Sequence, residues 1–222
     1  MHARGSNSRT CPMSANPILQ FEQLVLSRGK QRVAGPLDLS LMAGERGLVS
    51  GANGSGKTTL VLAIAGLIKP TSGRLERPAR IGLVPQEPDF PLHLSCHSYF
   101  QQLLGLGGRD HSSGSTTNKS TSSNQQLSQA LQLFGLEDVA KRPIGELSRG
   151  WRQRLNLARG WLSEPSLLIL DEPQTALDPD GMAALTAALA SLRQTAVLIV
   201  APAGVGCQNL APLVLDLSGG RV

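Results

Sequence analysis

Short apolar runs with strand-like spacing recur along the chain and predict a sheet. Apolar and polar residues alternate over residues 18–26 and 37–41, which is typical of strands at the edge of a sheet. Residues 80–86 form an apolar run that ends at the polar Gln86, and the runs at 167–170 and 197–200 are entirely apolar. All-apolar strands are typical of the middle of a parallel sheet, because both of their faces are buried.

Helical patterns separate these strands. Residues 60–67 form an apolar helical run, and apolar residues recur at helical spacing over residues 93–106. A further helical pattern over residues 127–136 stops near Gly135. Strands that alternate with helices predict an α/β fold.

The segment between the second and third helical patterns has a different composition. Residues 107–126 are dominated by Ser, Thr, Gly and Asn, and they hold too few apolar residues to offset the entropy of ordering them. We therefore expect a flexible insert here, and a phosphorylated regulatory insert is the alternative hypothesis.

Length and composition limit the class of protein. A chain of 222 residues accommodates one α/β domain, expected at residues 18–222 with a helical lobe at about 87–160. The formal net charge of +5 fits either a modestly basic soluble protein or an anionic partner. No aromatic-rich basic stripe is present, so we expect no nucleic-acid partner.

The cysteines and the amino terminus bear on location. The three cysteines have no paired spacing, which argues against a disulfide framework and favours a reducing compartment such as the cytoplasm. No apolar run approaches the roughly 18 residues of a spanning helix. Residues 1–17 are interpreted as a disordered extension or as preceding a start at Met13, and a weak organellar transit peptide is the alternative.

The strongest chemical motif lies between a short apolar stretch and the first helical run. It has the spacing of a phosphate-binding loop, in which glycines let consecutive backbone N–H groups surround a phosphate at a helix start. Lys57 is expected to reach the β- and γ-phosphates, and the Thr58 hydroxyl to hold Mg²⁺. The loop consists of Gly51, Ala52, Asn53, Gly54, Ser55, Gly56, Lys57, Thr58 and Thr59.

Two adjacent acids end the apolar run at 167–170. In a parallel sheet, the carboxyl ends of the strands are where ligands bind, so Asp171 is placed for the Mg²⁺ shell. Glu172 is placed to polarise a water molecule for attack on the γ-phosphate. Gln86 ends another strand and is expected at the same edge.

A third motif begins a basic helix. Leu147-Ser148 is a plausible helix start, with Ser148 as the cap and free backbone N–H groups in the first turn. Such a helix end binds anions, although an ordinary capped basic helix has the same pattern.

Taken together and in this order, these motifs resemble the ATP-binding cassette family of ATPases over nearly all of residues 18–222. The phosphate loop resembles the Walker A motif, Gln86 the Q-loop, and residues 147–151 the signature segment. Residues 167–172 resemble the Walker B strand, and residues 175–178 the D-loop. The tail at 215–222 resembles the final hairpin of such domains.

The resemblance implies a fold and a set of roles. The fold is a P-loop NTPase with a RecA-like parallel-sheet core, an antiparallel β subdomain and a helical subdomain. Glu172, Gln86 and Lys57 are the implied catalytic residues, and Thr58, Gln86 and Asp171 are the implied Mg²⁺ ligands. Two cassettes pair head to tail in that family, so Ser148 and Gly150 of one chain would meet the ATP held by the other.

Three departures from the family pattern stand out. Arg149 and Trp151 replace a Gly and a Gln of the usual signature, and Arg28 stands near the position of the aromatic residue that stacks on adenine. An Arg plane can also stack on a base. Pro202 occupies the position of the histidine that contacts the γ-phosphate, and proline offers neither a donor nor a titrating ring. We therefore expect ATP binding with slow hydrolysis.

The leading hypothesis is an ATP-hydrolysing subunit that drives separate transmembrane permease subunits from the inner face of the membrane. The permease surface is expected around residues 88–104. Residues 158–162 resemble, more weakly, the cytochrome c biogenesis haem-exporter cassettes. The alternatives are a hydrolysis-impaired regulatory or asymmetric partner cassette, which Pro202 favours, and a soluble non-transport cassette ATPase.

Overall fold

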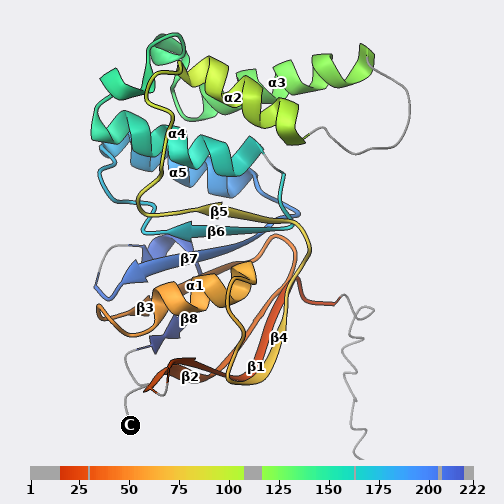
Figure 1. The fold of residues 1–222 in the computed structure, drawn as a ribbon, viewed down its shortest axis with the longest axis vertical. Coiled ribbons are helices and arrows are strands. Elements are labelled where there is room, and N and C mark those ends of the chain that lie inside the picture. The colour runs from red at the N-terminus through yellow and green to blue at the C-terminus, as the bar shows by residue number, and fades with distance from the viewer. Residues whose placement is uncertain (1–15, 30, 108–116, 163, 205–206, 218–222) are drawn as a thin grey trace, which may run out of the picture.

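The computed structural model describes residues 16–29, 31–107, 117–162, 164–204 and 207–217. Two sheets and five α-helices make up this part of the chain (Figure 1). The predicted extension at 1–17 lies almost wholly outside the described residues. Among those residues, no helix has the length and apolarity needed to cross a membrane.

The central sheet has five parallel strands in the order β5-β6-β7-β3-β8. These strands are β5 (Ile81–Val84), β6 (Leu167–Asp171), β7 (Ala196–Pro202), β3 (Arg46–Gly51) and β8 (Leu213–Asp216). Because all five run the same way, their carboxyl ends lie at one edge of the sheet. The predicted parallel sheet is therefore confirmed.

The middle strands of this sheet are buried on both faces. Alternate residues of β6 divide between two apolar cores, with Leu168 and Leu170 on one face and Leu167 and Ile169 on the other. All four are at most 1 % exposed, in agreement with the all-apolar run at 167–170. Helices α4 (Arg149–Leu162) and α5 (Pro179–Ser191) cover the first face. Helix α1 (Lys57–Ala65) covers the second.

A smaller antiparallel sheet completes the second core. Its strands are β1 (Leu19–Arg28), β2 (Gln31–Leu41) and β4 (Ser72–Glu76), in the order β2-β1-β4. Buried residues of β1, such as Phe21, share the core with α1 and with β3. This sheet lies at the opposite end of the molecule from α2 and α3 in Figure 1.

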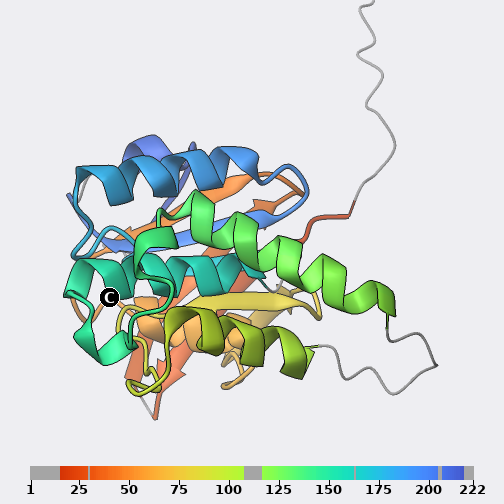
Figure 2. The ribbon, with the colours of Figure 1, turned by 90° about the horizontal axis from the view of Figure 1, so that it is seen from above.

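The helical end of the molecule consists of α2 (Cys96–Gly107) and α3 (Thr117–Leu133), which lie beside α4 (Figure 2). Helix α2 confirms the helical pattern at 93–106, and the Ser95 side chain accepts a hydrogen bond from the Ser98 N–H at 3.1 Å. Two 3₁₀ turns, Glu137–Val139 and Ile144–Glu146, connect α3 to α4, and a third, Gln208–Leu210, precedes β8.

The structure differs from the loop predicted for residues 107–126. The loop predicted for 107–126 is wrong from Thr117 onward, because α3 begins there, while residues 108–116 lie outside the described part. From Asn118 to Gln129 the sequence has neither glycine nor proline, and the apolar residues that follow pack on the first core. Packing of this kind extends helices whose own propensity is low.

Strand β4 was not predicted, because its sequence directly follows the turn residues Lys69-Pro70 and has no apolar alternation. Strand β8 pairs in parallel with β3 and forms no hairpin within the described residues. The remainder of the predicted final hairpin, residues 218–222, lies outside them.

Candidate functional site

The loop between β3 and α1 starts at the carboxyl end of a central strand. Strand β3 ends at Gly51, and α1 begins at Lys57 with Gly56 as its N-terminal cap residue. Gly54 and Gly56 have φ angles of 79° and 95°, in the left-handed region that favours glycine. A Cβ atom on Gly56 would lie 2.9 Å from the Ala34 Cβ, so this glycine is also required by packing.

Lys57 is held against the loop that precedes it. Its ammonium nitrogen donates hydrogen bonds to the carbonyl oxygens of Gly51 and Ala52, at 2.8 and 2.9 Å. The side chain is 8 % exposed, so a positive charge is fixed inside the loop. Ser55 Oγ is buried and lacks a hydrogen-bond partner among the described residues. A buried hydroxyl without a partner is costly unless a ligand supplies one.

Two other strands bring three polar side chains to the same edge. Gln86 follows β5, Asp171 ends β6, and Glu172 is the next residue. The Gln86 side-chain amide donates a hydrogen bond to a Glu172 carboxylate oxygen at 2.8 Å. The predicted meeting of these strand ends is therefore present in the structure.

The turn at Glu172 is unusual in its backbone. Glu172 has a φ of 48°, a region that residues with side chains rarely adopt. Its N–H donates to the Val200 carbonyl at 2.7 Å, and its own carbonyl accepts from the Thr175 N–H at 3.0 Å. These two bonds fix the direction in which the chain leaves β6.

The first of the two adjacent acids lies in an environment that opposes its ionisation. Burial raises the pKa of Asp171, and the neighbouring charge of Glu172 raises it further, while Lys57 acts in the opposite direction. Desolvation and like charge both oppose ionisation of a carboxyl group. A cation beside Asp171 would offset both effects, as is typical of carboxylates that hold metal ions.

A pocket of about 500 Å³ joins these groups. Its walls come from the phosphate loop, from the ends of β1, β5, β6 and β7, and from the start of β2. The lining residues are Arg28, Val33, Asn53, Gly54, Gly56, Lys57, Thr58, Thr59, Gln86, Asp171, Glu172 and Pro202. Arg28 and Pro202 thus lie where the sequence placed them, beside the phosphate loop and the two acids.

The donor set fits a nucleotide triphosphate with its metal. Gly54 has open space around the position of a Cβ atom, so its backbone is accessible to a ligand. An ammonium group and two carboxylates in one pocket match phosphate oxygens on one side and a hard cation on the other.

The signature segment lies outside this pocket. Helix α4 begins at Arg149, and Ser148 Oγ accepts a hydrogen bond from the Trp151 N–H at 3.3 Å, which confirms the predicted cap. Ser148 and Gly150 are not among the residues that line the pocket of the phosphate loop. Within one chain, therefore, the structure does not bring them to Lys57.

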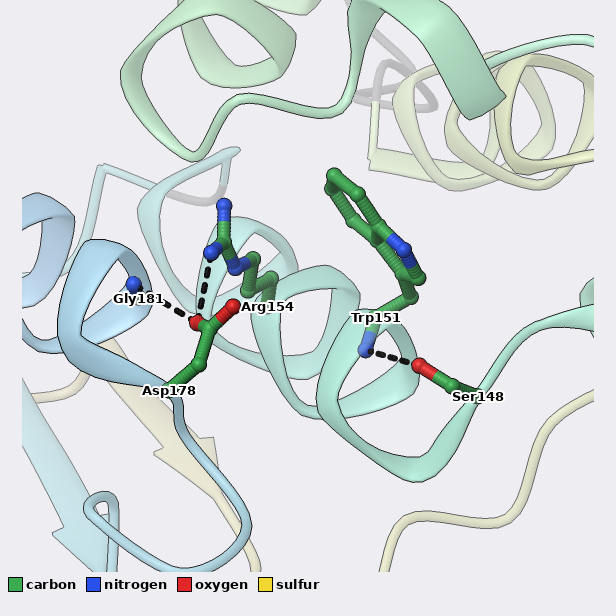
Figure 3. A network of polar contacts seen from close by, with 5 residues as sticks. All are labelled: Ser148, Trp151, Arg154, Asp178 and Gly181. Carbon is green, nitrogen blue, oxygen red and sulfur yellow. Dashed lines mark hydrogen bonds and ion pairs between the residues drawn. The ribbon is translucent and has the colours of Figure 1, made fainter.

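A buried arginine links α4 to the start of α5 (Figure 3). Arg154 is 7 % exposed, and its guanidinium donates a hydrogen bond to Asp178 Oδ1 at 2.5 Å. The guanidinium carbon also lies over the Trp151 ring, 4.8 Å from the ring centroid. The same Asp178 oxygen accepts from the Gly181 N–H at 2.9 Å and so caps α5. Asp178 is the last residue of the segment 175–178 that resembles the D-loop, whereas no sequence signal assigned a role to Arg154.

Two buried amides on α4 were also missed. Asn156 is completely buried and Gln153 is 5 % exposed. The signal was present, because both polar residues stand among Leu155, Leu157 and Ala158 on a helix that the apolar pattern places against the sheet. Buried polar side chains of this kind require hydrogen-bond partners.

The parallel sheet, the glycine-rich loop at a helix start and the acids at a neighbouring strand end together define a P-loop nucleoside triphosphatase. The family model for ABC transporters matches residues 34–175. The chain therefore belongs to the ABC transporter family of ATP-binding proteins, whose members hydrolyse ATP.

Curated relatives agree with this assignment. The cytochrome c biogenesis ATP-binding export protein CcmA of Xylella fastidiosa strain 9a5c is 36 % identical over 185 residues, which cover 78 % of each chain. CcmA of Escherichia coli O157:H7 is 32 % identical over 193 residues, which cover 82 % of this chain and 87 % of the relative. The zinc import ATP-binding protein ZnuC of Hydrogenovibrio crunogenus is 33 % identical over 185 residues, which cover 82 % of this chain and 70 % of ZnuC.

Solved structures share the fold. CbiO1 of Clostridium perfringens, part of the ABC transporter complex CbiONQ, superposes with a TM-score of 0.76 at 26 % identity, covering 94 % of this chain and 87 % of CbiO1. An inward-facing putative metal-chelate type ABC transporter superposes with a TM-score of 0.74 at 29 % identity, covering 91 % of this chain and 80 % of the other.

The Arg154–Asp178 contact predicts a specific dependence of stability on pH. The hydrogen bond from Arg154, followed by that from the Gly181 N–H, lowers the pKa of Asp178. A carboxyl whose pKa is depressed by folding stabilises the native state above its unfolded pKa of about 3.9, and this contribution is lost as the pH falls through the folded value. Asp178→Asn should therefore lower the melting temperature at pH 7. The difference in melting temperature between this variant and the wild type should narrow below about pH 4.

Thermal unfolding followed by circular dichroism from pH 7 to pH 3 measures this gap. Asp180→Asn in the first turn of α5 is the matched control, because that residue is exposed and shares the dipole of the helix but not the contact with Arg154. A gap for Asp178→Asn that is equal at every pH would contradict the electrostatic explanation.

Proposed function

We propose that this chain is the ATP-binding and ATP-hydrolysing subunit of an ABC transporter, which couples closure of a cassette dimer to transport by separate membrane subunits. The observation that carries the proposal is the single pocket shared by Lys57, Asp171, Glu172 and Gln86. It joins a phosphate cradle to two acids on the edge of a rigid parallel sheet.

In this proposal the phosphate loop binds the triphosphate of ATP. The backbone N–H groups of residues 51–59 surround the phosphates, and the ammonium of Lys57 supplies the positive charge. Thr58, Gln86 and Asp171 hold Mg²⁺, which neutralises charge on the phosphates when it is bound. Arg28, at the mouth of the pocket, offers a planar cation on which adenine can stack.

Glu172 and Gln86 carry the hydrolytic step. The carboxylate of Glu172 accepts a proton from the attacking water, and the hydrogen bond from Gln86 holds that carboxylate in place. Glu172 lies one residue beyond a strand that is buried on both faces, so the backbone that carries its side chain is rigid. This is the geometry that general base catalysis requires.

We further propose that the chain works as a cassette dimer, homo- or heterodimeric, and attaches to transmembrane permease subunits on the cytoplasmic face of the membrane. Ser148 and Gly150 then contact the ATP of the second cassette, which agrees with their position outside the pocket of their own chain. CbiO1, with which the fold superposes, is part of a transporter complex, and CcmA is a cytochrome c biogenesis export protein. The CcmA relatives favour the cytochrome c biogenesis branch.

Glu172→Gln tests the catalytic assignment. Removing the base should lower ATP turnover by about 10²- to 10⁴-fold, while the affinity for ATP stays within about 3-fold, because the phosphate loop is untouched. Release of inorganic phosphate and equilibrium binding of a fluorescent ATP analogue measure the two quantities. Glu137→Gln, in a 3₁₀ turn of the helical end, is the control and should retain wild-type turnover. Full turnover in Glu172→Gln would remove Glu172 from the proposal.

Pro202 accounts for the slow hydrolysis that we expect. It pairs with Gly51 at the end of β7 and lines the pocket beside Glu172, but it can neither donate a hydrogen bond nor transfer a proton. Pro202→His should therefore raise turnover by at least about 10-fold, since a positioned histidine contributes to proton transfer. Pro202→Ala, which opens the same space without an imidazole, is the matched control.

The same variants address a second candidate function, a regulatory cassette that binds ATP while a different cassette hydrolyses it. Pro202 is the observation that favours it. ATP binding without turnover in the wild type, with turnover restored by a partner cassette, would select this second function. Wild-type turnover at the level of ordinary transporter cassettes would show that the missing histidine limits nothing.

Attachment to a permease predicts copurification from native membranes. Leu92 is 52 % exposed and borders a pocket of about 500 Å³ between residues 86–92 and the first turn of α4. An integral membrane protein should copurify with the tagged chain, and Leu92→Glu should weaken its recovery. Leu67→Glu is the matched control, because Leu67 is 70 % exposed and lies just after α1, away from the predicted permease surface. Equal loss in both variants, or no membrane partner at all, would count against attachment at this surface.

A further inference from the structure

The two side chains that meet at the strand edge are each attached next to a proline. Gln86 directly follows Pro85, and Glu172 directly precedes Pro173. A proline lacks an N–H group, so its carbonyl is the only backbone group through which hydrogen bonds can fix it. What holds these two carbonyls therefore contributes to the positions of Gln86 and Glu172, in addition to the backbone hydrogen bonds of Glu172 itself.

Both carbonyls are held by α4. The Asn156 side-chain amide donates to the Pro85 carbonyl at 2.7 Å, and the Gln153 side-chain amide donates to the Pro173 carbonyl at 3.1 Å. The two side chains also contact each other, since Asn156 Nδ2 lies 3.4 Å from Gln153 Oε1. One helix thus connects the turn after β5 to the turn after β6.

This connection is buried and oriented. Asn156 is completely buried and Gln153 is 5 % exposed, so the two amide side chains are shielded from water. The guanidinium of Arg159 donates to Asn156 Oδ1 at 3.0 Å, which fixes the amide with its nitrogen toward Pro85. Residues 153, 156 and 159 are spaced by three and share one face of the helix.

We propose that Gln153 and Asn156 are positioning residues for hydrolysis, which set the contact between Gln86 and Glu172 by holding Pro85 and Pro173. The inference rests on the proposed function, in which Glu172 accepts the proton of the attacking water. Neither amide lines the pocket of the phosphate loop, so their effect on the reaction is assigned to the two turns that they hold.

Kinetics separate this role from a merely structural one. Asn156→Ala and Gln153→Ala should each lower kcat for ATP by about 10- to 100-fold, because a small displacement of a catalytic group has effects of that size. The KM for ATP should change by less than about 2-fold, since the phosphate loop keeps its contacts. In a Gln86→Ala background, Asn156→Ala should lower kcat by less than about 2-fold, because the contact that it positions is already absent.

Thr195→Val is the matched control. The Thr195 hydroxyl donates to the carbonyl of another proline, Pro165, at 2.9 Å, but at the opposite edge of the sheet, before β6 and β7. Loss of this hydrogen bond, like loss of those made by Asn156 and Gln153, should lower the melting temperature. In Thr195→Val, however, kcat should not change. Unchanged kcat in Asn156→Ala and Gln153→Ala, or a raised KM with unchanged kcat, would overturn the proposal.

A second readout does not depend on turnover. In ¹H–¹⁵N NMR spectra, the side-chain amide signals of Gln86, assigned with Gln86→Ala, should move in Asn156→Ala and Gln153→Ala toward their position in Glu172→Ala. The same signals should stay in place in Thr195→Val. If the chain binds ATP without hydrolysing it, the proposed hydrolysis is overturned, but the NMR comparison can still be made because it does not depend on turnover. Gln86 signals that do not move would overturn the positioning role.

Discussion

The parallel pairing of β5, β6, β7 and β3 is the constraint on which the rest of the structure depends. Asp171 pairs with Val200, and Gly51 pairs with Pro202, so the phosphate loop and the two acids leave the sheet within two residues of each other along β7. A parallel sheet requires helices on both faces, and the strands here are buried accordingly. Burial of the strands therefore fixes the site, because no strand can slip without exposing apolar residues to water.

Helix α4 gives this edge a second framework. Its leucines pack into the core between the sheet and the helical end, while its buried polar side chains reach out to other segments. Arg154 binds the residue that caps α5, and the amides of Gln153 and Asn156 bind the turns after β5 and β6. The turn after β5 and the segment from Pro173 to Asp178, which are far apart in the sequence, are thus both attached to one helix.

The sequence predicted the parts of the fold that depend on local pattern. All-apolar runs identified β6 and β7, glycines identified the phosphate loop, and Ser148 identified the start of α4. Each of these signals lies within a few neighbouring residues. The strand ends then met as expected, because parallel strands leave only one edge for them.

The parts that depend on distant contacts could not be predicted in the same way. Strand β4 has no alternating pattern of its own and is defined by its pairing with β1. Helix α3 extends back into a polar segment because its later turns pack on α4. The partners of Gln153 and Asn156 lie in turns that no local rule connects to α4, so the sequence showed that they are polar but not what they bind.

The first turn of α4 lies outside the pocket that the same chain forms. Four strand ends contribute to the pocket of the phosphate loop, yet the first turn of α4, with Ser148 and Gly150, lies outside it. A helix start of this kind presents backbone N–H groups that favour an anion. If a second cassette brings its phosphates to Ser148, a two-fold axis makes the contact reciprocal, so each closed dimer contains two composite sites. Because α4 also holds the turns next to Gln86 and Glu172, a contact at its first turn is mechanically connected to the strand edge of its own chain where those two side chains meet.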